Sequence, residues 1–138
     1  MQDTKTQVVK QAYAAFGRGD IQGILETLDD EILWKPVHGA ASYVPTAGER
    51  RGKASVKQFF ELVAQSMAFD QFEPREFVAQ GDKVIALGHY RARAKNGGQF
   101  ESDFVMVFAF RGDKIVGFQE FTDSAALNAA FMTVTAAS

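Results

Sequence analysis

Apolar residues recur at helical spacing in three segments of the first half of the chain. The first segment begins at Thr4, where a capping-box pattern starts, and ends at Gly17. The second follows the capping residue Asp20 and continues to Leu28. The third spans residues 54–67 and has the most regular apolar face, formed by Val56, Phe59, Phe60, Val63 and Met67. These patterns predict three amphipathic helices.

In the second half the apolar period changes to that of β-strands, with short glycine-containing turns between the apolar runs. Four strands are predicted, at residues 69–79, 84–94, 100–110 and 115–122. Because short turns join them, neighbouring strands must be antiparallel. Pro74 places an edge or a bulge in the first of them. A short strand at 32–34 precedes this group, and a helix capped by Asp123 follows it over 124–131. Helices followed by strands indicate an α+β domain.

The third of these strands has two apolar faces. Phe104, Met106, Phe108 and Phe110 alternate with Val105, Val107 and Ala109. A sheet covered by helices on one face buries only that face, so a second apolar face indicates a second subunit. We therefore expect a homodimer formed through the sheet. Residues 36–52 form a loop that is long for a compact domain, and the tail from residue 132 has no pattern and is expected to fray.

Composition narrows the possible functions. The 138 residues suit a single domain, and 13 phenylalanines suit a dry core or cavity wall. A net charge of -2 gives no reason to expect nucleic acid or an anionic membrane as a partner. With no cysteine and only two histidines, far apart in sequence, we expect no disulfide and no metal site. No phosphate-binding loop is present, so no cofactor is expected. Neither a signal peptide nor an apolar span of about 20 residues is seen, which favours a cytoplasmic protein.

Several motifs resemble one family. They are Val44-Pro45-Thr46-Ala47-Gly48, Arg51-Gly52-Lys53, the turn at 111–116 and the segment from Phe118 to Leu127. Together with the order of elements, they resemble the SnoaL-like group of the nuclear transport factor 2 and ketosteroid isomerase superfamily, over residues 4–131. The resemblance implies one domain over 1–138 with an ordered core at about 4–131. It also implies a cone-shaped fold, in which N-terminal helices pack on a curved antiparallel sheet that encloses a hydrophobic pocket.

The resemblance also implies a catalytic acid. SnoaL-type cyclases use an acidic residue near the end of the last strand, and Glu120 matches it. They tend to carry a histidine on the preceding strand, where this chain has Met106. The implied activity is a cofactor-independent acid/base isomerase, cyclase or hydrolase that acts on an apolar cyclic or polyketide-like compound. Because the histidine is missing, two alternatives stay open: a binding protein without chemistry, and a dimeric regulatory or stress module.

The residues themselves support a pocket around Glu120. Glu120 is expected to share its strand face with Val116 and Phe118, where apolar surroundings would raise its pKa, although it could instead face solvent or pair with an arginine. His38, on the long loop, is a second catalytic candidate as a proton shuttle. The expected substrate-binding residues are Trp34, Tyr43, Phe60, Tyr90, Phe104, Met106, Phe108 and Phe118.

Other polar residues are expected outside the pocket. His89 and Tyr90 are neighbours on a strand and must face opposite ways, so only one of them can point inward. Glu101 and Asp103 fall on the face opposite Phe104, where solvent or an interface is expected.

Overall fold

The computed structural model describes residues 4–132 of the chain. Its elements, in chain order, are α1 (Thr4–Gly17), α2 (Ile21–Leu25), β1 (Leu28–Lys35), β2 (Arg50–Arg51), α3 (Lys53–Ser66), β3 (Met67–Gln80), β4 (Lys83–Ala94), β5 (Gln99–Arg111), β6 (Lys114–Phe121) and α4 (Ser124–Phe131). The expected fraying of the C-terminal tail concerns residues 133–138, which lie outside the described residues. The predicted order of helices and strands is confirmed, with one addition: β2 lies within residues 36–52, which were predicted to be loop throughout, because Arg50 and Arg51 pair with Trp34 and Leu33 of β1.

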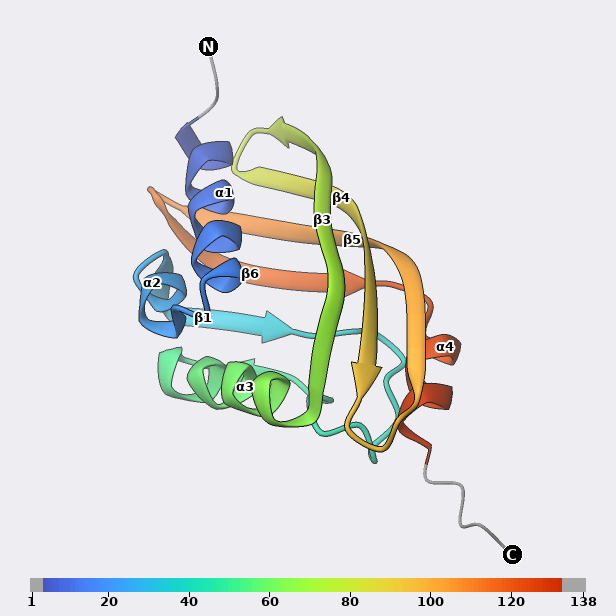
Figure 1. Cartoon of the computed structure of the whole chain (residues 1–138). Helices are drawn as coiled ribbons and strands as arrows, with labels where there is room; N and C mark the ends of the chain where they lie inside the picture. The colour runs from blue at the N-terminus through green and yellow to red at the C-terminus, as the bar shows by residue number, and fades with distance from the viewer. Residues whose placement is uncertain (1–3, 133–138) are drawn as a thin grey trace, which may run out of the picture.

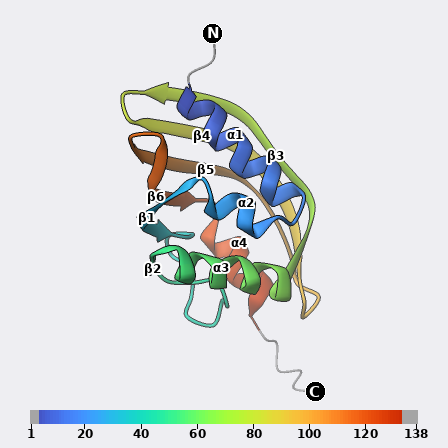
Figure 2. The same ribbon diagram turned by 90° about the vertical axis from the view of Figure 1, so that its left-hand side faces the viewer.

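The strands form one curved sheet in the order β2-β1-β6-β5-β4-β3. The hairpin strands β3 to β6 are antiparallel, as predicted. β1 pairs with β6 in parallel, which makes the sheet mixed. Figures 1 and 2 show α1, α2 and α3 along the concave side of this sheet, and α4 near its other end. The fold is therefore the expected cone-shaped α+β arrangement.

The β3 strand forms one of the two edges of the sheet, and its pairing with β4 shifts between Pro74 and Glu76. Proline cannot donate a hydrogen bond, so it is tolerated at an edge and at an irregularity. Pro74 predicted one feature or the other, and the structure has both. In Figure 1 the long β3 strand runs from the end of α3 across the front of the picture, where it crosses before β6 and β5.

The second helix is shorter than predicted. Asp20 caps it as expected, because its side chain accepts a hydrogen bond from Gly23 N at 2.9 Å. The helix ends at Leu25, however, and Leu28 already belongs to β1, where it pairs with Ile115 of β6. The helical spacing of Leu28 was misleading because a long-range strand pair outweighs local periodicity. In the N-terminal helix, Thr4 is itself helical, so it is not the residue that precedes the helix.

A bulge in β6 changes which residues face the helices. Phe118 and Glu120 pair with Phe108 and Met106 of β5, but Phe110 pairs with Ile115 after a shift of register. Ile115 is therefore buried on the inner face, and Val116 is only partly buried. The prediction that Val116 shares a face with Glu120 was wrong because a bulge breaks the strict alternation of a strand.

The inner face of the sheet carries the core. Buried residues alternate with more exposed ones along β4 and β5, as predicted. Gly88 of β4 permits close packing here, because an added Cβ would overlap the Phe104 ring and Glu73 O. Aromatic rings fill most of the space between sheet and helices, so this side of the molecule is largely apolar. Among residues 4–132, no helix is long and apolar enough to cross a membrane.

Candidate functional site

Glu120 lies at the end of β6 on the inner, apolar face of the sheet, with its side chain buried. The Tyr90 hydroxyl donates a hydrogen bond to Glu120 Oε2 at 2.7 Å. Burial raises the pKa of Glu120 to about 7, although the bond from Tyr90 opposes this shift. A carboxyl group with this pKa is present in both protonation states near neutral pH, so it can both give and take a proton.

Two tyrosines lie beside this acid. Burial, together with the nearby charge of Glu120, raises the pKa of both Tyr90 and Tyr13, so both hydroxyls keep their protons. The Tyr13 hydroxyl donates to Met106 Sδ at 3.0 Å. A thioether is a weak acceptor, which leaves Tyr13 available to a better one such as a ligand oxygen. Sequence reasoning had not proposed Tyr13 as a site residue, although it lies on the apolar face of the first helix.

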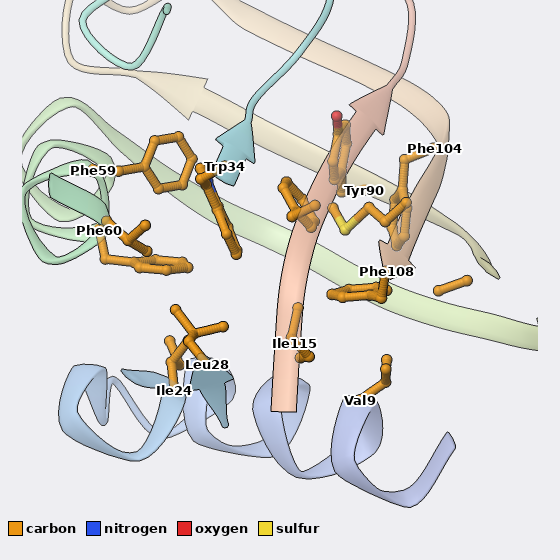
Figure 3. Close-up of a cluster of buried hydrophobic side chains, with 14 of the residues drawn as sticks. Val9, Ile24, Leu28, Trp34, Phe59, Phe60, Tyr90, Phe104, Phe108 and Ile115 are labelled. Carbon is orange, nitrogen blue, oxygen red and sulfur yellow. The ribbon is translucent and has the colours of Figure 1, made fainter. Parts of the chain in front are cut away.

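An apolar cavity of about 90 Å³ adjoins Glu120; we call it the inner cavity. Its walls come from α1, α3 and strands of the sheet. Six of the expected substrate-binding residues line it: Trp34, Phe60, Tyr90, Met106, Phe108 and Phe118. In Figure 3, Trp34, Phe59 and Phe60 lie on one side of the close-up, with Tyr90 and Phe108 on the other. Trp34 also stacks on Phe118, with ring centroids 3.8 Å apart.

A second cavity of about 50 Å³ lies on another side of Glu120, beneath the loop between β1 and β2; we call it the loop cavity. Pro36, Val37 and Thr46 of the loop line it, as does Leu127 of α4. The inner cavity and the loop cavity share five wall residues: Phe59, Val63, Phe69, Tyr90 and Glu120. The acid and its tyrosine therefore face both spaces.

The loop above this second cavity is tied to α4 by Asn128. Asn128 Oδ1 accepts from Ala41 N at 2.8 Å, and its Nδ2 donates to Gly39 O at 3.0 Å. The Tyr43 hydroxyl donates to Asn128 O at 3.2 Å. A residue on the last helix thus fixes the loop in place as one wall of the site.

Three predicted site residues lie outside both cavities. Phe104 is buried, but it stacks on Tyr90 at 5.0 Å and supports that ring from behind. Tyr43 is 47% exposed and contacts Asn128. His38 is exposed, and its ring stacks on Phe121 at 4.5 Å. The loop turns His38 toward the surface, so it does not reach Glu120 with its imidazole.

The outer face of the sheet holds a separate polar cluster. His89 faces away from Tyr90, and its two ring nitrogens lie 2.7 Å from carboxylate oxygens of Asp103 and Glu101. These contacts raise the pKa of His89. The expected outward position of both acids is confirmed. Asp123 caps α4, as its side chain accepts from Ala126 N at 3.0 Å. Within residues 4–132, no group of three or more acidic, histidine or cysteine side chains is arranged to hold a metal ion.

Comparison with known proteins agrees with the fold. The chain matches the model of the SnoaL-like domain over residues 9–118 and therefore belongs to this family. A search of curated proteins found no significant match.

Solved structures resemble the protein over nearly its whole length. An NTF2-like protein from Burkholderia xenovorans is 33% identical to this chain, with a TM-score of 0.84. The alignment covers 94% of this chain and 96% of that one. An NTF2-like protein of unknown function from Burkholderia pseudomallei is 27% identical, with a TM-score of 0.85 and coverage of 96% and 100%. TerC, crystallised with polyporic acid, is 25% identical, with a TM-score of 0.78 and coverage of 95% and 100%.

Proposed function

We propose that the protein is a cofactor-independent enzyme that moves a proton on an apolar, ring-containing substrate, with Glu120 as the general acid and base. The observation that carries this proposal is a buried carboxyl with a pKa of about 7 that faces an apolar cavity. General acid/base catalysis is most effective when the pKa of the catalytic group lies near the working pH.

The proposed step is proton abstraction next to a carbonyl group. The Glu120 carboxylate takes a proton from the carbon, and the electron pair of that C–H bond moves toward the carbonyl oxygen to form an enolate. Tyr13, now bonded only to the Met106 sulfur, donates its hydrogen bond to the enolate oxygen. Glu120 then returns the proton to carbon or oxygen. No oxidant or reductant is needed, and isomerisation and ring closure can both start with this step.

Met106 bears on the choice of reaction. It pairs directly with Glu120 across β5 and β6, so the strand position expected for a histidine carries no base. A single carboxyl that takes and returns the same proton is sufficient for an isomerase. We therefore favour isomerisation over hydrolysis, which would also require an activated water.

Deuterium exchange tests this proposal without knowledge of the natural substrate. The protein is incubated in D₂O with a panel of cyclic and aryl ketones, and deuterium incorporation beside the carbonyl is followed by NMR. We expect exchange with at least one ketone, and an at least ~100-fold loss of rate in Glu120→Gln, because general acid/base catalysis contributes about 10²–10⁴-fold. The exposed Glu61→Gln on α3 is the matched control. Equal rates in wild type and Glu120→Gln would refute the role of Glu120.

A binding protein without chemistry is the second candidate. Met106 favours this candidate, because the polar groups of the inner cavity are then one titrating acid, two phenols and the Trp34 indole N–H. TerC, a structure of the same fold, was crystallised with a small molecule, which supports small-molecule binding by either reading. Ligand binding without deuterium exchange on any ketone would favour this candidate. A regulatory module would show neither ligand binding nor deuterium exchange.

We further propose that two copies pair through the outer face of the sheet. Half-buried apolar side chains gather there on β4 and β5: Ile85, Leu87, Val105 and Val107. An apolar sheet face with a polar rim is suited to a second copy of itself. Sedimentation should show a dimer that Leu87→Glu converts to a monomer, with Glu76→Gln on the exposed edge strand as control. A monomeric wild type would contradict this pairing.

A further inference from the structure

The two cavities meet at the only polar groups that both contain. Glu120 and Tyr90 line the inner cavity and the loop cavity alike, and their side chains are joined by the 2.7 Å hydrogen bond. The remaining shared residues are Phe59, Val63 and Phe69, and all three are apolar. Because these five residues line both spaces, the two cavities are adjacent.

The two spaces differ in the shape of their walls. Flat rings dominate the inner cavity: Tyr13, Phe16, Trp34, Phe60, Phe72, Phe108 and Phe118. The part of the loop cavity that is not shared has one aromatic ring, Phe100, and one hydroxyl, Thr46. Its other residues are not aromatic: Pro36, Val37, Met67 and Leu127. Aromatic rings pack well against other rings, whereas an aliphatic wall suits a chain of methylenes. The inner cavity is thus suited to a ring and the loop cavity to a short tail.

Their sizes limit what can bind. An apolar cavity of about 150 Å³ in another protein accepts benzene. The inner cavity, at about 90 Å³, is smaller, so one ring is its upper limit and requires slight movement of its walls. The loop cavity, at about 50 Å³, has room for a few methylenes. A fused polycyclic ligand does not fit either space.

We infer that the inner cavity and the loop cavity are two lobes of one binding site. Its ligand has a single aromatic ring in the inner cavity, a short aliphatic tail in the loop cavity, and a carbonyl group between them. The α-carbon of that carbonyl lies at Glu120, and its oxygen accepts a hydrogen bond from Tyr13. This inference rests on the site of the proposed function and adds to it the class of substrate, an aryl alkyl ketone or its enol.

Three probes separate the features of this ligand. Butyrophenone has the ring, the central carbonyl and the tail. Benzaldehyde lacks the tail. The isomer 4-phenyl-2-butanone has the same atoms as butyrophenone, but its carbonyl lies away from the ring. Binding is measured by quenching of the fluorescence of Trp34, the single tryptophan, which lines the inner cavity.

For the wild-type protein we expect butyrophenone to bind at least about ten-fold more tightly than benzaldehyde, because each buried methylene is worth roughly four-fold in affinity. We expect it to bind at least about three-fold more tightly than its isomer, because only its carbonyl reaches the junction of the lobes. Equal affinity for butyrophenone and benzaldehyde, or for the two isomers, would overturn the two-lobed site.

Filling one lobe at a time provides a second test. Thr46→Leu enlarges a side chain that lines only the loop cavity, so it should bring butyrophenone to within about two-fold of benzaldehyde and leave benzaldehyde unchanged. Ala12→Leu, in the inner cavity, should weaken both ketones. Ser42→Leu, an exposed position of the same loop, is the matched control and should change neither.

A retained preference for butyrophenone in folded Thr46→Leu would contradict the inference. If Thr46→Leu does not fold, the comparison of probes on the wild-type protein still decides. The two proposals can be refuted independently. If the probes bind with the expected preferences but no deuterium exchange occurs, only the proposed catalysis is refuted. If exchange occurs but the tail gives no preference in binding, only the two-lobed site is refuted.

Discussion

Replacing Glu120 with glutamine should change how the stability of the protein depends on pH. In the folded protein the carboxyl has a pKa of about 7, against 4.5 for the same group in solvent. Between these values the folded state keeps its proton while the unfolded state releases it, so the unfolded state binds fewer protons. Wild-type stability therefore falls as pH rises through this range. Glutamine has no charge to bury, and the variant lacks this contribution.

The size of the effect follows from the two pKa values. Each unit of difference corresponds to about 1.4 kcal/mol, so the free energy of unfolding of wild type should fall, relative to Glu120→Gln, by about 3 kcal/mol between pH 4 and 8. Almost all of this change lies between about pH 4.5 and 7. At pH 4 Glu120 is mostly protonated in both the folded and the unfolded state. The difference in free energy of unfolding between wild type and Glu120→Gln at this pH therefore reports mainly the replacement of a neutral acid by an amide.

Urea unfolding of both proteins at half-unit steps of pH measures the difference directly. Other groups also titrate: His89 stabilises the folded state at low pH and loses that contribution as pH rises through its raised pKa. Because His89 is present in both proteins, its contribution cancels in their difference. Glu61→Gln should follow wild type throughout. A difference between Glu120→Gln and wild type that stays constant across this range would show that Glu120 ionises as in solvent, and would refute the reasoning behind its catalytic role.

Three more substitutions test other parts of the site. Tyr90→Phe removes the bond that lowers the pKa of Glu120, so the wild-type loss of stability should extend to higher pH in urea titrations; an unchanged profile would show that this bond is unimportant. Asn128→Ala removes the side-chain bonds to Gly39 and Ala41 and should cost about 1–3 kcal/mol in urea unfolding, with faster amide exchange at Ala41, whereas Ala129→Ser on the same helix should cost little. Gly88→Ala should lower the melting temperature by several degrees, because its Cβ would overlap the Phe104 ring and Glu73 O, and a stable variant would contradict the close packing seen there.

Local patterns predicted most of the fold. The α3 helix, the hairpin strands and the caps at Asp20 and Asp123 depend on neighbouring residues, and the sequence shows those directly. The parallel pairing of β1 with β6 joins segments about 85 residues apart, and no local pattern indicates it. The same pairing places Leu28 in β1 and not in the second helix.

The site was predictable in part for the same reason. Glu120 was proposed from its resemblance to the acid of SnoaL-type cyclases, and Met106 from alignment along the hairpin. The structure pairs these two residues across β5 and β6. Tyr13 was missed because the contact of an N-terminal helix with a C-terminal strand depends on how the layers pack. The surface position of His38 depends on the path of a loop, which residue types alone do not determine.

The bulge at Val116 is the reason that Glu120 points inward. Side chains alternate along a strand, so with Ile115 facing the core a regular β6 would send residues 117 and 119 inward and the acid outward. One additional residue reverses this assignment for every position after it. Deletion of Val116 would therefore remove the bulge and still leave Ile115, Phe118 and Glu120 on the inner face of a regular strand. At its present length, β6 can bury both Ile115 and Glu120 only while the bulge persists.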